Sequence, residues 1–256
     1  MPVDDALTRF SNRVKDYIRY RPGYPVAVID CLREEFGLRS NHVIADIGSG
    51  TGISVGLFLE NGNRVIAVEP NADMRAAAEA AYGGNARFES VNAQAEGTTL
   101  PGASVDWIVA AQAFHWFDVE KCRVEFRRIL KPGALAALLW NDRKDDSPFL
   151  KGYDALLKEF AIDYEAIDHR HAESDGRIER LFAPGAPARR VFANHQDFDF
   201  EGLRGRVLSS SYMPSADHPR FGPMIEAMRR LYDAHQSGDR VRFAYDTKLF
   251  VGPLGA

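Results

Sequence analysis

Short apolar runs alternate with amphipathic stretches along most of the chain, a pattern typical of a sheet covered by helices. Buried parallel strands form continuous apolar runs, and four such runs lie at residues 43–47, 64–69, 105–111 and 134–140. Residues 86–92, 189–200 and 241–251 instead alternate apolar and polar positions, as half-buried strands do. The pattern therefore predicts seven strands.

Amphipathic segments with start and stop signals separate these strands. We expect helices at residues 26–36, 53–60, 72–82, 119–130, 149–160, 201–208 and 217–235. Asn71 and Asp118 each precede a predicted helix, where a side-chain oxygen can accept from a free backbone N–H. Because strands and helices alternate, the fold class is α/β with a doubly wound sheet.

A glycine-rich turn joins the first strand to the helix that follows it. Gly48, Gly50 and Gly52 allow positive φ and a close approach of the backbone to a ligand. The free N–H groups at the start of the next helix face the same ligand. Glu69 ends the second strand, where a carboxylate can accept hydrogen bonds from both ribose hydroxyls. The unit suits an adenosine-containing cofactor.

The glycine spacing differs from that of dinucleotide-binding proteins. Their fingerprint, G-x-G-x-x-G, would require a glycine at position 53, and the chain has Ile53 there. An NAD-dependent oxidoreductase is therefore the less favoured alternative.

Four stretches in order resemble one family, the class I S-adenosylmethionine-dependent methyltransferases. They are residues 20–25, 46–52, 68–71 and 130–134, the first of which matches the Tyr-Arg-Pro-x-Tyr-Pro arm of small-molecule methyltransferases. The resemblance implies a Rossmann-like seven-stranded sheet of order 3-2-1-4-5-7-6 with the last strand antiparallel, and a helical lid insertion. It also implies S-adenosyl-L-methionine as cofactor and S-adenosyl-L-homocysteine as product.

The same resemblance implies a domain layout. Residues 1–256 would form a single methyltransferase domain. Its cofactor-binding core would comprise residues 40–141 and 188–254, with lid elements at residues 1–25 and 145–185.

The cofactor contacts implied by the resemblance fall on the matched stretches and on two loops. They are Tyr20, Arg21, Asp46, Gly48, Ser49, Gly50, Gly52, Glu69, Pro70, Gln94, Ala95 and Gln112. Asp46 would serve the methionine amino group, Glu69 the ribose, and Gln94 with Ala95 the adenine. Arg21 or Tyr20 would meet the methionine carboxylate, although a surface ion pair for Arg21 and simple packing for Tyr20 remain open.

An aromatic segment follows the fourth strand, at the sheet edge where open α/β sheets bind ligands. The expected substrate pocket consists of Phe114, His115, Trp116, Trp140 and Tyr212. His115 and Gln112 are the candidate catalytic residues. His115 can act as a base or only position a group, because methyl transfer from a sulfonium depends mainly on proximity and orientation.

Two positions depart from the family pattern. Gln94 replaces an acidic residue that commonly meets the adenine amine, although its carbonyl can still accept a hydrogen bond. Ser210 stands where relatives often have arginine in a Ser-Arg-Ser-Tyr segment. The second difference weakens any transfer of substrate type from the family.

Composition narrows the function further. The chain has 256 residues and a net charge of −4, which does not favour nucleic acid or an anionic membrane as partner. Cys31 and Cys122 lie far apart, so we expect no disulfide framework. His169 and His171 lack a carboxylate at a metal-binding spacing, and we expect no metal.

These observations lead to an expected function. The first residues are acidic without an apolar signal region, which predicts a cytoplasmic protein. We expect methyl transfer to a small-molecule acceptor. A protein that binds the cofactor without turnover stays an alternative, and nucleic-acid methylation is less favoured because no base-holding motif is present. Neither the acceptor nor the oligomeric state follows from the sequence.

Overall fold

The structure is a computed structural model that describes residues 18–162, 176–210 and 212–255. Its strands are β1 (Val43–Ile47), β2 (Arg64–Val68), β3 (Phe88–Val91), β4 (Val105–Ala111), β5 (Leu130–Arg143), β6 (Ala188–Phe198) and β7 (Val241–Gly252). Its helices are α3 (Ala27–Phe36), α4 (Ile53–Glu60), α5 (Ala72–Tyr82), η2 (Phe114–Trp116), α6 (Val119–Ile129), α7 (Pro148–Phe160), α9 (Arg177–Phe182), α10 (Phe200–Leu208) and α11 (Phe221–His235).

The strands form one seven-stranded sheet in the order β3-β2-β1-β4-β5-β7-β6. β1 to β5 pair in parallel, and β7 runs antiparallel to both β5 and β6. The expected strand order and antiparallel last strand are thus confirmed. The carboxyl ends of β1, β2 and β4 share one edge, to which they deliver their loops.

Apolar side chains of the sheet alternate between two helical layers. Ile44, Val65 and Val109 face α3 and α4 on one side. Ile47 and Ile108 face α6 and α9 on the other. This alternation follows from strand geometry, which points successive side chains to opposite faces. Both faces are covered, so the parallel strands are apolar throughout.

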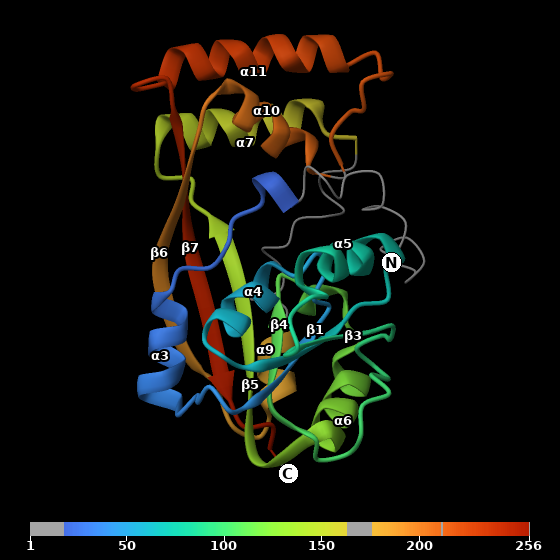
Figure 1. Ribbon diagram of the computed structural model, residues 1–256. Coiled ribbons are helices and arrows are strands. Elements are labelled where there is room, and N and C mark those ends of the chain that lie inside the picture. The colour runs from blue at the N-terminus through green and yellow to red at the C-terminus, as the bar shows by residue number, and fades with distance from the viewer. Residues whose placement is uncertain (1–17, 163–175, 211, 256) are drawn as a thin grey trace.

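A third apolar cluster lies away from these layers and holds α7, α10 and α11 together; we call these three helices the cap. Its buried members include Phe149, Tyr153, Leu203, Val207, Met224, Met228, Tyr232, Phe243 and Tyr245. Figure 1 shows the cap at one end of the molecule, above the end of β5 that leads into α7, with the C-terminus at the opposite end. The expected layout places the segment containing α10 and α11 in the cofactor-binding core, and both helices pack in the cap cluster.

The structure corrects two predicted boundaries. β5 begins at Leu130 rather than at residue 134, because its first residues already pair beside β4 and its last residues pair with β7. α9 was not expected, since its segment was assigned to the lid. Ile178, Leu181 and Phe182 are instead buried in the core beside α6.

Some expectations fall outside the described residues. They concern residues 1–17 of the arm, residues 163–175 of the lid and the His169 and His171 pair. We use the term arm below for residues 18–25. Among the described helices, none is long and apolar enough to cross a membrane.

Candidate functional site

The glycine turn after β1 is shaped by backbone contacts that exclude side chains. Gly48 donates its N–H to the carbonyl of Val68 at 2.8 Å and has φ of 68°. A Cβ at Gly48 would lie 2.7 Å from the Cβ of Ala113, so no larger residue fits. Gly50 has φ of 56°, and a Cβ there would meet, among the described residues, only the sulfur of Met74 at 3.7 Å. The Gly50 side of the turn therefore has room for a ligand to approach the backbone.

Asp46 lies at the base of this turn and is fully buried. Its Oδ2 accepts a hydrogen bond from Ser54 Oγ on α4 at 2.6 Å, and its Oδ1 has no partner among the described residues. Burial raises the pKa of Asp46 to about 7, partly offset by the Ser54 bond, and the nearby charge of Glu69 adds to the rise. Asp46 thus presents an acceptor oxygen that a cationic ligand group could satisfy.

Ser49 and Thr51 add two more unsatisfied groups to the same turn. Both side chains are buried, and neither hydroxyl bonds to any residue that the structure describes. Buried polar atoms rarely stay unpaired in proteins, so each of these groups indicates a missing partner. Together with Asp46 Oδ1, they make the turn a site prepared for a polar ligand.

Glu69 stands across the turn and supports it. One carboxylate oxygen accepts from the Gly50 N–H at 2.9 Å, and the other accepts from the Asn71 N–H at 2.8 Å. Burial raises the pKa of Glu69, while these two backbone bonds lower it. Each carboxylate oxygen can accept more than one hydrogen bond, so ribose hydroxyls can still bind there.

The loop after β3 carries the two residues expected to contact adenine, and they differ in solvent exposure. Gln94 is exposed, and Ala95 is buried at 6% exposure beside the core. Glu96 accepts a hydrogen bond from the Asp118 N–H at 2.8 Å, which ties this loop to the start of α6. Pro70, the remaining ribose-side residue, is partly buried after β2.

Gln112 follows β4 in an uncommon backbone conformation. Its φ is 55°, a left-handed value that a residue with a side chain adopts at a cost. Its N–H donates to Leu139 at 2.8 Å, and its Nε2 donates to the carbonyl of Asn141 at 3.1 Å. These bonds hold Gln112 at the junction of β4 and β5, next to the glycine turn.

His115 occupies the middle of η2, the short helical turn after Gln112. Its ring lies 4.9 Å from that of Trp116, and its carbonyl accepts from Arg177 on α9 at 2.8 Å. Both ring residues are partly exposed. The hydrogen bond from Arg177 on α9 thus holds the backbone of His115 in place.

Two residues expected in the substrate pocket are buried against the sheet. Phe114 is fully buried, and its ring packs against those of Phe117 and Trp140 at 6.0 and 6.3 Å. Trp140 is 3% exposed and also packs against Phe250. Their place in a substrate pocket stays a prediction.

The arm connects the sheet to the cap. Arg21 donates from Nη2 to the Ser209 carbonyl at 3.2 Å and to Ser210 Oγ at 3.4 Å, both at the end of α10. Asn141 donates to the Gly23 carbonyl at 3.1 Å. The ring of Tyr20 lies so close to Gly205 that a Cβ there would overlap it. Tyr212, the last expected pocket residue, lies partly buried against the cap.

Sequence reasoning missed several polar residues of this site. Thr51 and Ser54 complete the glycine turn, and Asn141 links it to the arm. Asn141 is buried and also bonds Asn194 on β6 and Thr247 on β7. A polar residue at the end of an apolar strand was the available signal for Asn141.

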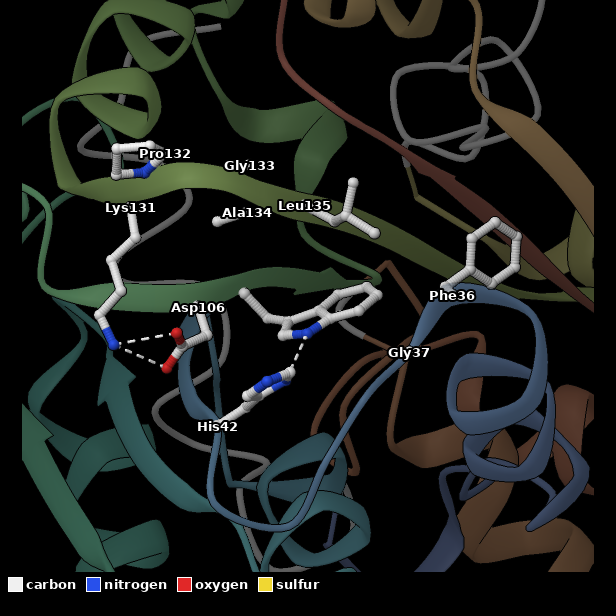
Figure 2. A pocket seen from close by; sticks show the side chains of 10 residues that line it. Phe36, Gly37, His42, Asp106, Lys131, Pro132, Gly133, Ala134 and Leu135 are labelled. Carbon is white, nitrogen blue, oxygen red and sulfur yellow. Dashed lines mark hydrogen bonds and ion pairs between the residues drawn. The ribbon is translucent and has the colours of Figure 1, made fainter.

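A cavity of about 260 Å³ lies at the opposite edge of the sheet. Figure 2 shows Lys131 pointing at Asp106, and its Nζ lies 2.9 Å from each carboxylate oxygen. The indole N–H of Trp107 donates to Nδ1 of His42 at 3.2 Å. Because it lies at the amino ends of β4 and β5, this cavity is separate from the glycine turn.

Comparisons with known proteins agree on one family. A family model for a methyltransferase domain matches residues 45–138. An uncharacterized methyltransferase-like protein of Schizosaccharomyces pombe is 30% identical over 256 residues, which cover 95% of this chain and 94% of the relative. An uncharacterized methyltransferase of Mycobacterium tuberculosis is 34% identical over 141 residues, 55% of each chain.

Solved structures share the fold. A candidate type II methyltransferase from Anaeromyxobacter dehalogenans has a TM-score of 0.69 and 26% identity, covering 92% of this chain and 98% of its own. The phosphoethanolamine N-methyltransferase 2 of Haemonchus contortus, solved with S-adenosyl-L-methionine, has a TM-score of 0.54 at 16% identity, covering 98% of this chain and 59% of its own.

The geometry and these relatives lead to the same result. The glycine turn has unsatisfied buried groups, an acidic residue follows β2, and the strand order is that of the matched structures. With a relative that spans nearly its whole length, this chain belongs to the class I methyltransferase family.

Proposed function

We propose that this protein transfers a methyl group from S-adenosyl-L-methionine to a small-molecule acceptor. The observation that carries the proposal is the group of buried oxygens around the glycine turn that no described residue pairs: Asp46 Oδ1, Ser49 Oγ and Thr51 Oγ1. An ammonium group and neighbouring polar groups of an amino-acid moiety would satisfy them. The missing side chain at Gly50 leaves space for such a ligand at the backbone.

The residues around the turn fit the parts of this cofactor. Asp46 would hold the methionine ammonium, and Glu69 would accept from the ribose hydroxyls while keeping its bonds to the backbone. Gln94 and Ala95 would meet the adenine. Arg21 would reach the methionine carboxylate only by giving up or sharing its contacts with Ser209 and Ser210.

When bound, S-adenosyl-L-methionine supplies a methyl group on a sulfonium, which is already activated for in-line displacement. The protein's task is then mainly to align the acceptor and exclude water, effects that can lower a barrier by about 7–11 kcal/mol at best. Gln112, fixed by Leu139 and Asn141, would set the position of the reacting groups. His115 would orient the acceptor or take its proton.

The arrangement of the cap supports a small acceptor. The arm and α10 contact each other beside the carboxyl edge of the sheet, and an arm held there would limit the size of an acceptor. The net charge of −4 also disfavours a nucleic-acid substrate.

Calorimetric titration tests the cofactor. We expect S-adenosyl-L-methionine and S-adenosyl-L-homocysteine to bind with micromolar dissociation constants and NAD not to bind. Binding of NAD alone would overturn the proposal. Binding of the two adenosyl ligands without release of S-adenosyl-L-homocysteine over a broad acceptor screen would favour a non-catalytic binding protein.

A further inference from the structure

Arg206 on α10 carries a positive charge that the described part of the chain leaves unpaired inside the cap. The residue is only 7% exposed, and its Nε and Nη1 atoms have no hydrogen-bond partner among the described residues. Within residues 18–162, 176–210 and 212–255, no carboxylate forms an ion pair with it. Arg204, two residues earlier on the same helix, instead has a side chain that is 43% exposed and pairs with Glu201 at 3.3 Å.

The walls around Arg206 are neutral. Tyr153, Tyr212 and Tyr245 interact electrostatically with its guanidinium. Tyr245 also shares a hydrogen bond with Arg206, and its hydroxyl donates to Gln196 at 3.1 Å. Tyr153 and Tyr245 are almost fully buried. Their hydroxyls supply dipoles and hydrogen bonds, but at neutral pH they supply no negative charge.

The nearby carboxylate is already used by other cations. Asp154 on α7 accepts from Arg143 at 2.8 Å and from Lys158 at 2.7 Å. The guanidinium of Arg143 lies over the ring of Tyr153 at 4.7 Å, so the two charges share this region. Asp154 therefore already has two cationic partners.

A buried, unpaired guanidinium is costly, because it gives up hydration without gaining a counter-charge. A ligand that supplies an anion would remove this cost. The cap is densely packed with aromatic rings, including Phe243 against Tyr153 at 4.8 Å and against Phe149 at 5.2 Å.

Arg206 is connected to the reaction side of the sheet. It lies in the last turn of α10, three and four residues before Ser209 and Ser210, which follow the helix. Ser210 and Ser209 contact Arg21 of the arm, and the arm reaches Asn141. Asn141 in turn accepts from Gln112 at 3.1 Å. A series of direct contacts thus leads from the end of α10 to the residue beside the glycine turn.

We propose that Arg206 binds a carboxylate group of the methyl acceptor, so that the substrate is an organic acid. The guanidinium has two donor atoms, Nε and Nη1, without a partner among the described residues, and each can donate a charge-assisted hydrogen bond to a carboxylate oxygen. A carboxylate, with a single charge, balances the one unpaired cation, and a phosphate would bring more charge than this site offsets. This inference rests on the proposed function for its role in catalysis, but the anion site itself does not.

Benzoate is the probe for this site. We would titrate it at constant ionic strength into the protein alone and into the protein saturated with S-adenosyl-L-homocysteine, with benzamide as the neutral control. We expect benzoate to bind and benzamide not to bind. Arg206→Met should weaken benzoate binding by about tenfold or more, since hydrogen bonds to a charged group are lost. Arg206→Lys should retain part of the affinity for benzoate. Arg204→Gln should bind benzoate as tightly as the wild type.

The outcomes separate this inference from the proposed function. Equal benzoate binding by the wild type and Arg206→Met, or no benzoate binding at all, overturns the anion site even where S-adenosyl-L-homocysteine binds normally. Failure of S-adenosyl-L-homocysteine to bind overturns the proposed function and leaves the benzoate result valid. Thermal unfolding tests whether the variant is folded. Arg206→Met should unfold at the same temperature as the wild type or a higher one, because it removes an unpaired buried charge.

Discussion

Asp46 shows how burial sets the behaviour of one residue. Its pKa of about 7 lies above the value of an exposed or unfolded aspartate, near 4. Between these two values the folded protein keeps the proton that the unfolded chain releases, so stability falls as pH rises through this window. This decrease in the free energy of unfolding is complete above pH 7 and amounts to a few kcal/mol.

Asp46→Asn should remove this pH dependence. We expect the variant to gain stability relative to the wild type as pH rises from 5 to 8, because its amide cannot ionise. Denaturant unfolding at several pH values measures the difference. A constant difference between the two proteins across this range would mean that Asp46 ionises with an ordinary pKa.

Glu69 can act on the cofactor directly or through the glycine turn, and a ligand analogue separates the two. Glu69→Gln should weaken binding of S-adenosyl-L-homocysteine by about tenfold, because the amide loses an acceptor. Binding of the 2′-deoxy analogue should weaken less, since one ribose contact is already missing. Equal losses for both ligands would limit Glu69 to supporting Gly50. Glu89→Gln is the control, because Glu89 is exposed and pairs only with Arg64 among the described residues.

At the scale of single residues, the sequence predicted which residues form the turn but not how deeply they are buried. Three glycines and Glu69 were found by spacing alone. The burial of Asp46 and of Phe114 depends on packing from α4 and from the sheet, which no local pattern reports. Arg206 was missed for the same reason, since an arginine in an amphipathic helix is ordinarily exposed.

Among the elements, the contact between the arm and α10 gives a direct test. A methyl group at Gly205 would overlap the ring of Tyr20, so Gly205→Ala should displace the arm and lower stability by about 1–3 kcal/mol. Truncation of the ring in a second variant, Tyr20→Ala with Gly205→Ala, should recover part of the loss. Denaturant unfolding measures both.

Gly222 on α11 provides the matched control. It lies in a helix, and a Cβ there would meet no atom of the described residues within 4 Å. Gly222→Ala should therefore stabilise the protein by about 0.5–1 kcal/mol, because alanine restricts the unfolded chain more than glycine does. Equal effects of both alanine substitutions would contradict the close contact of Tyr20 with α10.

The elements themselves followed well from periodicity. The predicted limits of β4 and α4 match the structure, because each is bounded by turn residues. α9 was missed because it has six residues and follows a polar segment, too short for a helical period to show. β5 was predicted too short, since its ends are defined by neighbouring strands rather than by its own residues.

In the whole molecule, β5, β6 and β7 join the cofactor-binding layers to the cap. Their pairing continues to Arg143 with Tyr245 and to Phe198 with Val241, where the strands enter the cap cluster. We expect amides in these upper segments to exchange with solvent as slowly as those of β4. Hydrogen exchange followed by mass spectrometry measures this. Fast exchange confined to the upper segments would show that the cap opens independently of the sheet.

The start of β5 has a consequence for the interpretation of related sequences. Lys131 pairs with Asp106, which also accepts from the Val43 N–H at 2.8 Å, so this motif fastens the starts of three strands. It stands at the far end of the strands from Gly48 and Gly50. A homologue could therefore keep the Lys-Pro-Gly signature after losing its catalytic power. Genome surveys that score this motif would therefore count inactive homologues together with active methyltransferases.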